Sequence, residues 1–292
     1  GDHLHCGGHG DHGHADEHAD HDHDEHEHGS VPRVVLASDR WDVRGQWNNP
    51  VAGIAAVRLR GGLTNYRHDE VEDGAIATTF KNRAHDLRLE AEHQPIAGWR
   101  GTLGVQTSNR RFSAEGEEAY VQPTETQRQS LYLLEELRQG DWRWQAALRH
   151  DRQRVTALQS DERRSHHATA LSLGSSWNFT PGYNLNASLT SGARLPTAEQ
   201  MFAHGLHLAT ATYELGNANL KRERAQSLDL GLAKTMGDTT WSLNAYHYRM
   251  KNFIYGNTLD AVDGLQLLQY SQANARFTGW EAQLTQKLNR NL

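Results

Sequence analysis

Cysteine, proline and long apolar runs are all scarce in this chain of 292 residues. It has one cysteine and six prolines. A single cysteine excludes an internal disulfide framework. No stretch approaches the ~18 consecutive apolar residues of a membrane-spanning helix, so a helical membrane protein is excluded. Basic residues are outnumbered by acids, 30 to 36, and no basic stripe interleaved with aromatic residues occurs. We therefore expect no nucleic-acid partner.

Catalytic motifs are missing as well. The chain contains no nucleophile elbow, no zinc-protease helix motif and no glycine-rich phosphate loop. We therefore expect no enzyme activity. It also lacks a signal peptide and begins inside a tract of biased composition, so we expect it to be part of a longer protein.

Residues 1–30 form a tract rich in histidine and acid, and we expect it to be a separate metal-capturing segment. Residues 1–28 hold ten histidines and nine acids, with no lysine or arginine. Such a composition cannot offset its ordering entropy by burying apolar surface. Imidazole suits zinc, copper and nickel, and carboxylates can complete a coordination shell. The irregular spacing predicts many overlapping weak sites, made by His3, His5, His9, His12, His14, His18, His21, His23, His26 and His28.

Two features of this tract leave alternatives open. Its histidines could be inert members of a solvated acidic loop, whereas an expression tag would run its histidines together. Cys6 could be a soft metal ligand or half of a disulfide whose partner precedes residue 1.

From residue 31 onward the dominant period is two, which predicts β-strands. Trp41, Val43 and Trp47, for example, alternate with charged or polar neighbours such as Arg40 and Asp42. The runs are about 12 to 15 residues long, whereas strands of soluble proteins have about 5 or 6. A membrane-spanning strand needs about 9 to 11 residues in the bilayer. We count about eleven such strands.

Connections alternate between short and long. Short turns are predicted near residues 48–50, 94–98, 139–141, 180–182 and 236–238, and long polar loops at 67–78, 110–124, 156–165, 195–224 and 255–264. Short turns opposite long loops are typical of an outer-membrane β-barrel. Since bacterial barrels have even strand numbers and no open edge survives in lipid, we expect about half of a larger barrel, completed elsewhere in the parent chain.

Aromatic and charged residues support the same fold. Six tryptophans, with Phe179 and Tyr183, lie beside the short turns, where an aromatic girdle is expected: Trp47, Trp99, Trp142, Trp144, Trp177 and Trp241. The alternative is a soluble sandwich or propeller with tryptophan in its core. Charges on alternate positions predict a hydrated lumen lined by Arg40, Arg44, Arg58, Arg60, Arg88, Arg143, Arg149, Asp42, Asp86, Glu90 and Glu92.

Two motifs near residues 191–232 carry a resemblance to a known family. Arg194-Leu195-Pro196-Thr197-Ala198-Glu199 precedes the longest expected loop, and Leu215-Gly216-Asn217-Ala218-Asn219-Leu220-Lys221-Arg222-Glu223 leads into the next strand. Together with Phe277-Thr278-Gly279-Trp280-Glu281, they resemble the C-terminal half of TonB-dependent outer-membrane receptors. The resemblance implies an all-β, antiparallel transmembrane barrel of 22 strands in the whole receptor, with the plug domain absent from this chain.

Further segments resemble the zinc-uptake (ZnuD-like) branch of that family. They are the histidine-rich tract, Gly205-Leu206-His207-Leu208-Ala209-Thr210, Tyr66-Arg67-His68-Asp69-Glu70 with Ala77-Thr78-Thr79-Phe80, and the stretch 112–123. The resemblance implies a zinc site between plug and barrel. We map its barrel histidine to His207 and expect a carboxylate, for which Glu70 beside His68 is our choice. His204 and the pair His166-His167 are interpreted as ordinary loop or strand histidines.

The resemblance also implies partners and a location. It predicts a monomeric barrel in the outer-membrane lipid of a Gram-negative bacterium, energised through the plug by the inner-membrane TonB–ExbB–ExbD complex. Zn²⁺ is the expected cargo. A receptor for haem, a siderophore, copper or nickel is the alternative within the architecture, since imidazoles alone do not select among first-row metals. A passive metal-buffering surface protein is the alternative of another class.

Overall fold

The computed structural model describes residues 33–117, 119–207, 210–262 and 264–288. The histidine-rich tract and Cys6 lie outside these residues. Within them the chain forms eleven long antiparallel strands of 12 to 24 residues. These are β1 (Arg33–Asn48), β2 (Ile54–Glu72), β3 (Ala75–His93), β4 (Trp99–Gly116), β5 (Thr124–Gln139), β6 (Trp142–Ala157), β7 (Glu162–Thr180), β8 (Tyr183–Arg194), β11 (Glu223–Lys234), β12 (Thr239–Val262) and β13 (Leu265–Gln286).

Three short elements occupy the connection between β8 and β11. They are α1 (Ala198–Phe202), β9 (His204–His207) and β10 (Thr212–Leu215). The long strands pair with their neighbours in chain order, and β10 then adds to β13 in parallel, with β9 outside it. In the described part of the chain no helix is long and apolar enough to cross a membrane.

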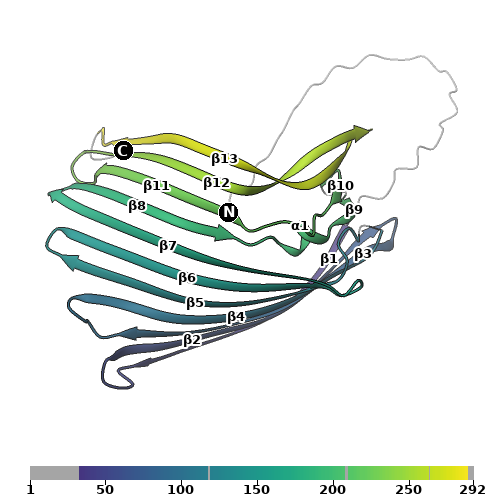
Figure 1. Cartoon of the computed structure of the whole chain (residues 1–292), viewed down its shortest axis with the longest axis horizontal. Coiled ribbons are helices and arrows are strands. Elements are labelled where there is room, and N and C mark those ends of the chain that lie inside the picture. Colours follow the sequence, from purple (N-terminus) through teal and green to yellow (C-terminus); the bar gives the residue numbers. More distant parts are fainter. Residues whose placement is uncertain (1–32, 118, 208–209, 263, 289–292) are drawn as a thin grey trace, which may run out of the picture.

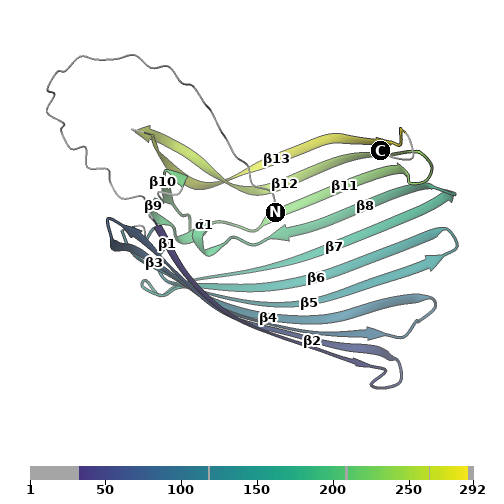
Figure 2. The ribbon, with the colours of Figure 1, turned by 180° about the vertical axis from the view of Figure 1, so that it is seen from behind.

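Figures 1 and 2 show one continuous, twisted and curved sheet, with the five turns that the sequence predicts to be short together at one end. The β8–β11 connection, with α1, β9 and β10, lies at the other end, which we call the loop end. The eleven long strands match the number predicted from periodicity. The all-β, antiparallel prediction is confirmed.

The predicted loop lengths are wrong at three places. Strands β2 and β3 are separated by two residues, β12 and β13 by two, and β6 and β7 by four. Strand β4 also continues to Gly116, inside the expected loop 110–124. The cause is that strands project beyond the apolar band, where their outer face is polar, so polar composition does not mark a loop there. Among the loop-end connections of the described sheet, only β4–β5 and β8–β11 are longer than four residues.

An exposed apolar band covers the outer face of the sheet. Register places Leu59 opposite Leu89, Leu89 opposite Val105, and Val105 opposite Leu131, so these side chains share one face. Each is 39–52% exposed although large and apolar. Contiguous exposed apolar surface on a long-stranded sheet is the lipid-facing band of a barrel.

The tryptophans lie on this outer face as well. Trp142 stacks on Trp144 and Trp177, with ring centroids 5.0 and 4.9 Å apart. The row continues through Phe179, Tyr183 and Trp241 on neighbouring strands. No tryptophan of the described residues is buried in a core. This arrangement excludes the soluble alternative and agrees with an aromatic girdle at the short-turn end.

At the loop end the pattern of the strands is inverted. The inner face of β6 carries buried Val155 and Ala157, while its outer face carries Arg152 and Arg154. A buried apolar cluster forms here, where inward-facing strand residues pack against the β8–β11 connection: Val155, Ala157, Ala198, Met201, Phe202, Leu220 and Ile254. The connection therefore folds back over the concave side of the sheet and is held there by hydrophobic packing.

Candidate metal centre at the loop end

The β8–β11 connection starts with a capped helical turn. The Thr197 hydroxyl accepts a hydrogen bond from the Gln200 amide, and the Gln200 side chain accepts one from the Thr197 amide. This reciprocal capping box satisfies two amides that the turn itself leaves without partners. Just before it, the Gln153 side-chain amide donates to the Pro196 carbonyl at 2.8 Å. The first family-like motif thus begins a short helix and ties it to β6.

The second motif closes the connection against that helix. Gly216 donates its amide to the Ala203 carbonyl at 2.6 Å, and a Cβ at Gly216 would lie 2.7 Å from the backbone of Met201. Only glycine permits this approach. Arg194 and Glu223, the outer residues of the two motifs, are opposite each other in register and form an ion pair. The motifs are therefore the two ends of one closed structure.

A second contact joins the connection to the β4–β5 loop. Val121 and Ala203 form an isolated bridge, and His204 donates its amide to the Tyr120 carbonyl at 2.6 Å. A Cβ at Gly205 would lie 2.9 Å from the Tyr120 Cα. These contacts bring Tyr120 against the β9–β10 hairpin, beside His207.

His207 is held by an aromatic ring and a buried carboxylate. Its ring stacks on Tyr120, with centroids 4.4 Å apart and an interplanar angle of 7°. Its Nδ1 lies 2.8 Å from Glu214 Oε1, and the Glu214 side chain is only 8% exposed. The hydroxyls of Thr212 and Tyr270 also donate to Glu214. Because a carboxylate only accepts, Nδ1 of a neutral His207 carries the proton and Nε2 carries the lone pair.

The surroundings of this pair are partly buried and negatively charged. Burial, followed by the charges of Glu214 and Glu199, raises the pKa of the Tyr120 hydroxyl to about 12, while Arg110 opposes the shift. Arg110 also pairs with Glu199 at 3.4 Å. Tyr120 therefore remains a neutral ring at physiological pH.

His68 and Glu70 form a separate pair on the inner face of β2. His68 Nε2 is 3.8 Å from Glu70 Oε1, and its ring stacks on Phe80 at 4.5 Å. His68 Nδ1 is buried without a hydrogen-bond partner. The structure thus brings His68 and Glu70 together, as their spacing suggested, but pairs His207 with Glu214 instead. Within the described ranges no three His, Cys, Asp or Glu residues are gathered as a metal cage.

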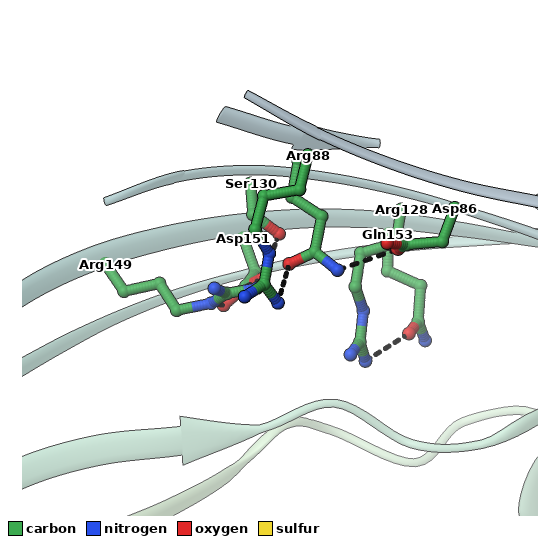
Figure 3. A network of polar contacts seen from close by, with 8 residues as sticks. Asp86, Arg88, Arg128, Ser130, Arg149, Asp151 and Gln153 are labelled. Carbon is green, nitrogen blue, oxygen red and sulfur yellow. Dashed lines mark hydrogen bonds and ion pairs between the residues drawn. The ribbon is translucent and has the colours of Figure 1, made fainter. Parts of the chain in front are cut away.

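The inner face of the long strands carries a network of polar contacts (Figure 3). Arg149 and Asp151 form an ion pair at 2.9 Å, and Ser130 donates to Asp151 at 2.6 Å. Gln106 donates to Asp86 at 2.7 Å and accepts from Arg88. Nearer the short turns, Arg58 pairs with Glu92 at 2.5 Å. Paired charges therefore line the concave side, as the alternation predicted.

Sequence reasoning missed Glu214, Tyr120 and Tyr270. Glu214 is seven residues from His207, and the alternation of polar and apolar residues over 212–215 is the local signal of the strand that carries it. Tyr120 lies in the stretch 112–123 that resembles the zinc-uptake branch, but nothing singled it out within that stretch, and Tyr270 carries no such signal. The ten tract histidines lie outside the described residues and remain sequence-based predictions.

Comparison with known families decides the class of the protein. The model of the family "TonB dependent receptor-like, beta-barrel" matches residues 10–292. The chain belongs to this family. Its members are transporters and receptors of the Gram-negative outer membrane and not enzymes, so this TonB-dependent receptor barrel is an outer-membrane protein.

Solved receptors share the fold at low sequence identity. The copper transporter OprC is 14% identical, with a TM-score of 0.73, covering 87% of this chain and 44% of its own. The hemophore receptor HasR of Serratia marcescens, in complex with HasA and haem, is 12% identical with a TM-score of 0.66, covering 87% and 46%. The FrpB iron transporter of Neisseria meningitidis is 12% identical with a TM-score of 0.67, and the match covers 90% of this chain and 44% of the transporter. The chain thus spans less than half the length of these receptors.

Proposed function

We propose that this chain is the C-terminal part of a receptor barrel that imports a scarce metal ion, with Zn²⁺ as the cargo. The observation that carries the proposal is the His207–Glu214 pair. A carboxylate on one imidazole nitrogen fixes the ring and its tautomer, and makes the other nitrogen a better zinc ligand. Here Nε2 would be that ligand, and the ring is further fixed by Tyr120.

Residues 1–30 would act as a capturing segment above residues 31–292, the partial barrel. Many weak sites on a tethered tract raise the local concentration of the ion without tight binding. The ion would pass to His207, and then to ligands supplied by a plug domain. Movement of the plug, driven by the TonB–ExbB–ExbD complex, would admit it to the periplasm.

The described sheet also supports a larger, monomeric barrel. The outer edge of β1 pairs with no described strand, and β13 pairs beyond β12 only with the four residues of β10. Open edges are not tolerated in lipid, since unpaired backbone groups there have no water to bind. Further strands and a plug from the parent chain would close the wall within one molecule.

Copper, nickel, haem and siderophores remain alternative cargoes. Imidazole binds Cu²⁺ more tightly than Zn²⁺, so selectivity must come from the geometry of the complete site. The structural neighbours include a copper transporter and a hemophore receptor, at identities that speak for the fold alone. A metal-buffering surface protein without transport is the alternative of another class.

The test is metal binding and uptake by the intact receptor. His207→Gln should abolish high-affinity Zn²⁺ binding, measured by calorimetry, and uptake of radioactive zinc by cells. Glu214→Gln should weaken binding about 10- to 100-fold, the usual effect of losing a carboxylate behind a ligand. His204→Gln is the matched control, since His204 contacts Tyr213 and not Glu214. Unchanged zinc affinity in His207→Gln would refute the assignment, and binding without uptake would favour buffering. Competition with Cu²⁺, Ni²⁺ and haem identifies the cargo.

The tract is tested separately, by calorimetry of a peptide comprising residues 1–30. Ligand histidines must be neutral, so zinc affinity should fall between pH 7.5 and 5.5, on either side of the ordinary histidine value of about 6.5. Equal affinity at both pH values would show that the imidazoles are not the ligands.

A further inference from the structure

A gap in the wall of the sheet lies at the loop end between β7 and β12. Pairing of β7 with β8 stops at Leu171 and Ser191, and pairing of β11 with β12 stops at Arg224 and Lys251. Above these points the last residues of β8, 192–194, and residues 220–224 stand between the two long strands. A pocket of about 610 Å³ opens there, lined by Ser165, His166, His167, Leu220, Lys221, Arg222, Arg224, Lys251, Asn252 and Asn274. We call it the wall pocket.

The wall pocket is lined by four cations and no acid. Lys221, Arg222, Arg224 and Lys251 form no ion pair among the described residues. The nearest acid in sequence, Glu223, points to the other face and pairs with Arg194. On the same outer face, Arg111 and Arg163 have carboxylate partners, Glu125 and Asp161. The wall pocket is therefore a concentration of uncompensated positive charge.

Two of these cations oppose each other directly. Arg224 and Lys251 are cross-strand partners in the β11–β12 register. Like charges in this position repel and destabilise the strand pair. An anion held between them would turn that repulsion into attraction. Arg83 and Arg111 oppose each other in the same way, but Asp39 lines the cavity beside them and Arg111 pairs with Glu125, whereas no acid lines the wall pocket. This cation pair without a neighbouring acid is the sign that the pocket takes a negatively charged group.

The backbone around the pocket is already fixed. The Gln272 side chain bonds both the amide and the carbonyl of Lys221, at 2.9 and 2.7 Å, and donates to the Asn252 carbonyl. Arg222 donates to the His167 carbonyl at 2.6 Å. His166 Nε2 is 3.0 Å from the Leu220 carbonyl, and its Nδ1 is buried without a hydrogen-bond partner. The cations thus project from a preformed frame.

We infer that the wall pocket is a binding site for a phosphate group. Its cations would supply charge-assisted hydrogen bonds, and arginine suits the tetrahedral oxygens of phosphate. The phosphate could belong to a glycolipid of the surrounding leaflet or be free in solution. This site is distinct from the His207 pair and does not depend on the cargo of the receptor.

The experiment uses the intact receptor with two probes. One is inorganic phosphate, added to receptor in detergent. The other is bis-phosphorylated lipid A in nanodiscs, compared with dephosphorylated lipid A. Affinity is measured by calorimetry and native mass spectrometry, and stability by the thermal midpoint. The variant is Arg224→Gln with Lys251→Gln. The matched control, Arg83→Gln with Arg111→Gln, also removes two outer-face charges, on β3 and β4.

A phosphate-bearing probe should bind the wild type and the control, and should bind the pocket variant at least about tenfold more weakly, as expected for two lost charged donors. Without phosphate, the variant should be at least as stable as the wild type, because the repulsion is relieved. Preference for phosphorylated lipid A over inorganic phosphate identifies a glycolipid, and equal binding identifies a free anion. If neither probe binds, or the pocket variant and the control respond alike, the inference is overturned.

Discussion

The ion pair between Arg194 and Glu223 allows a sharp test of how the two family motifs hold the loop end together. Glu223 is 2% exposed, whereas the Arg194 side chain is 49% exposed. Glu223 also accepts a hydrogen bond from the Ile254 amide at 2.5 Å. The two partners are therefore unequal: the buried charge of Glu223 depends on Arg194, whereas the half-exposed charge of Arg194 can be hydrated by water.

This difference in exposure decides which of the two substitutions lowers the free energy of unfolding more. Arg194→Gln leaves a buried carboxylate with only the Ile254 amide close by, which should cost about 3 kcal/mol, the lower end of the range for breaking a buried pair. Glu223→Gln keeps an acceptor for Ile254 and leaves a half-hydrated guanidinium. Its cost should be about 1 kcal/mol, close to that of one ordinary hydrogen bond. The double variant should cost less than the sum, because the residues act as a pair.

The assay is guanidinium unfolding of the refolded receptor in lipid vesicles, followed by tryptophan fluorescence. Arg163→Gln is the control, since its pair with Asp161 is exposed on both sides, and it should cost under about 0.5 kcal/mol. If Glu223→Gln destabilises the receptor more than Arg194→Gln, the reasoning from burial is refuted. Equal effects of both single variants and the control would show that the pair does not stabilise the loop end.

Three further predictions use the same unfolding assay. Leu148→Arg on the apolar outer face should cost about 2–4 kcal/mol near the bilayer centre, whereas Ala147→Arg on the inner face should cost far less, and equal costs would contradict the assigned faces. Gly216→Ala should cost about 1–3 kcal/mol because its Cβ overlaps the backbone at the end of α1, and Gly45→Ala, with nothing within 4 Å, serves as control. Because burial raises the pKa of Tyr120 from 10 to about 12, the stability of the wild type should decline as pH rises from 10 to 12, and Tyr120→Phe should show less of this decline.

Much of the candidate site lay beyond sequence reasoning, and the reason is physical. The period-two pattern of β6 predicts a strand in any environment, but it does not say where the strand leaves the bilayer. Val155 and Ala157 point inward there because the β8–β11 connection covers them, and this is a long-range contact. The strands β2, β4, β6 and β12 therefore extend through segments that the sequence predicts to be loops.

At His207, too, the sequence predicts one residue of the site and long-range contacts decide its partners. The motif around residue 207 directed attention to His207, but its carboxylate partner depends on the β9–β10 hairpin, which pairs His207 with Thr212 in register and brings Glu214 within hydrogen-bonding distance. Tyr120 arrives from another loop through the bridge between Val121 and Ala203. No local pattern connects these residues.

The amino-acid sequence by itself determined the long strands, the apolar outer face, the charged inner face and the aromatic girdle, because side chains alternate strictly along a strand and one face must meet lipid. Only the tertiary structure decided which groups meet at the loop end. Those contacts join residues far apart along the chain, and they form only once the β8–β11 connection folds back onto the sheet and its buried side chains find partners.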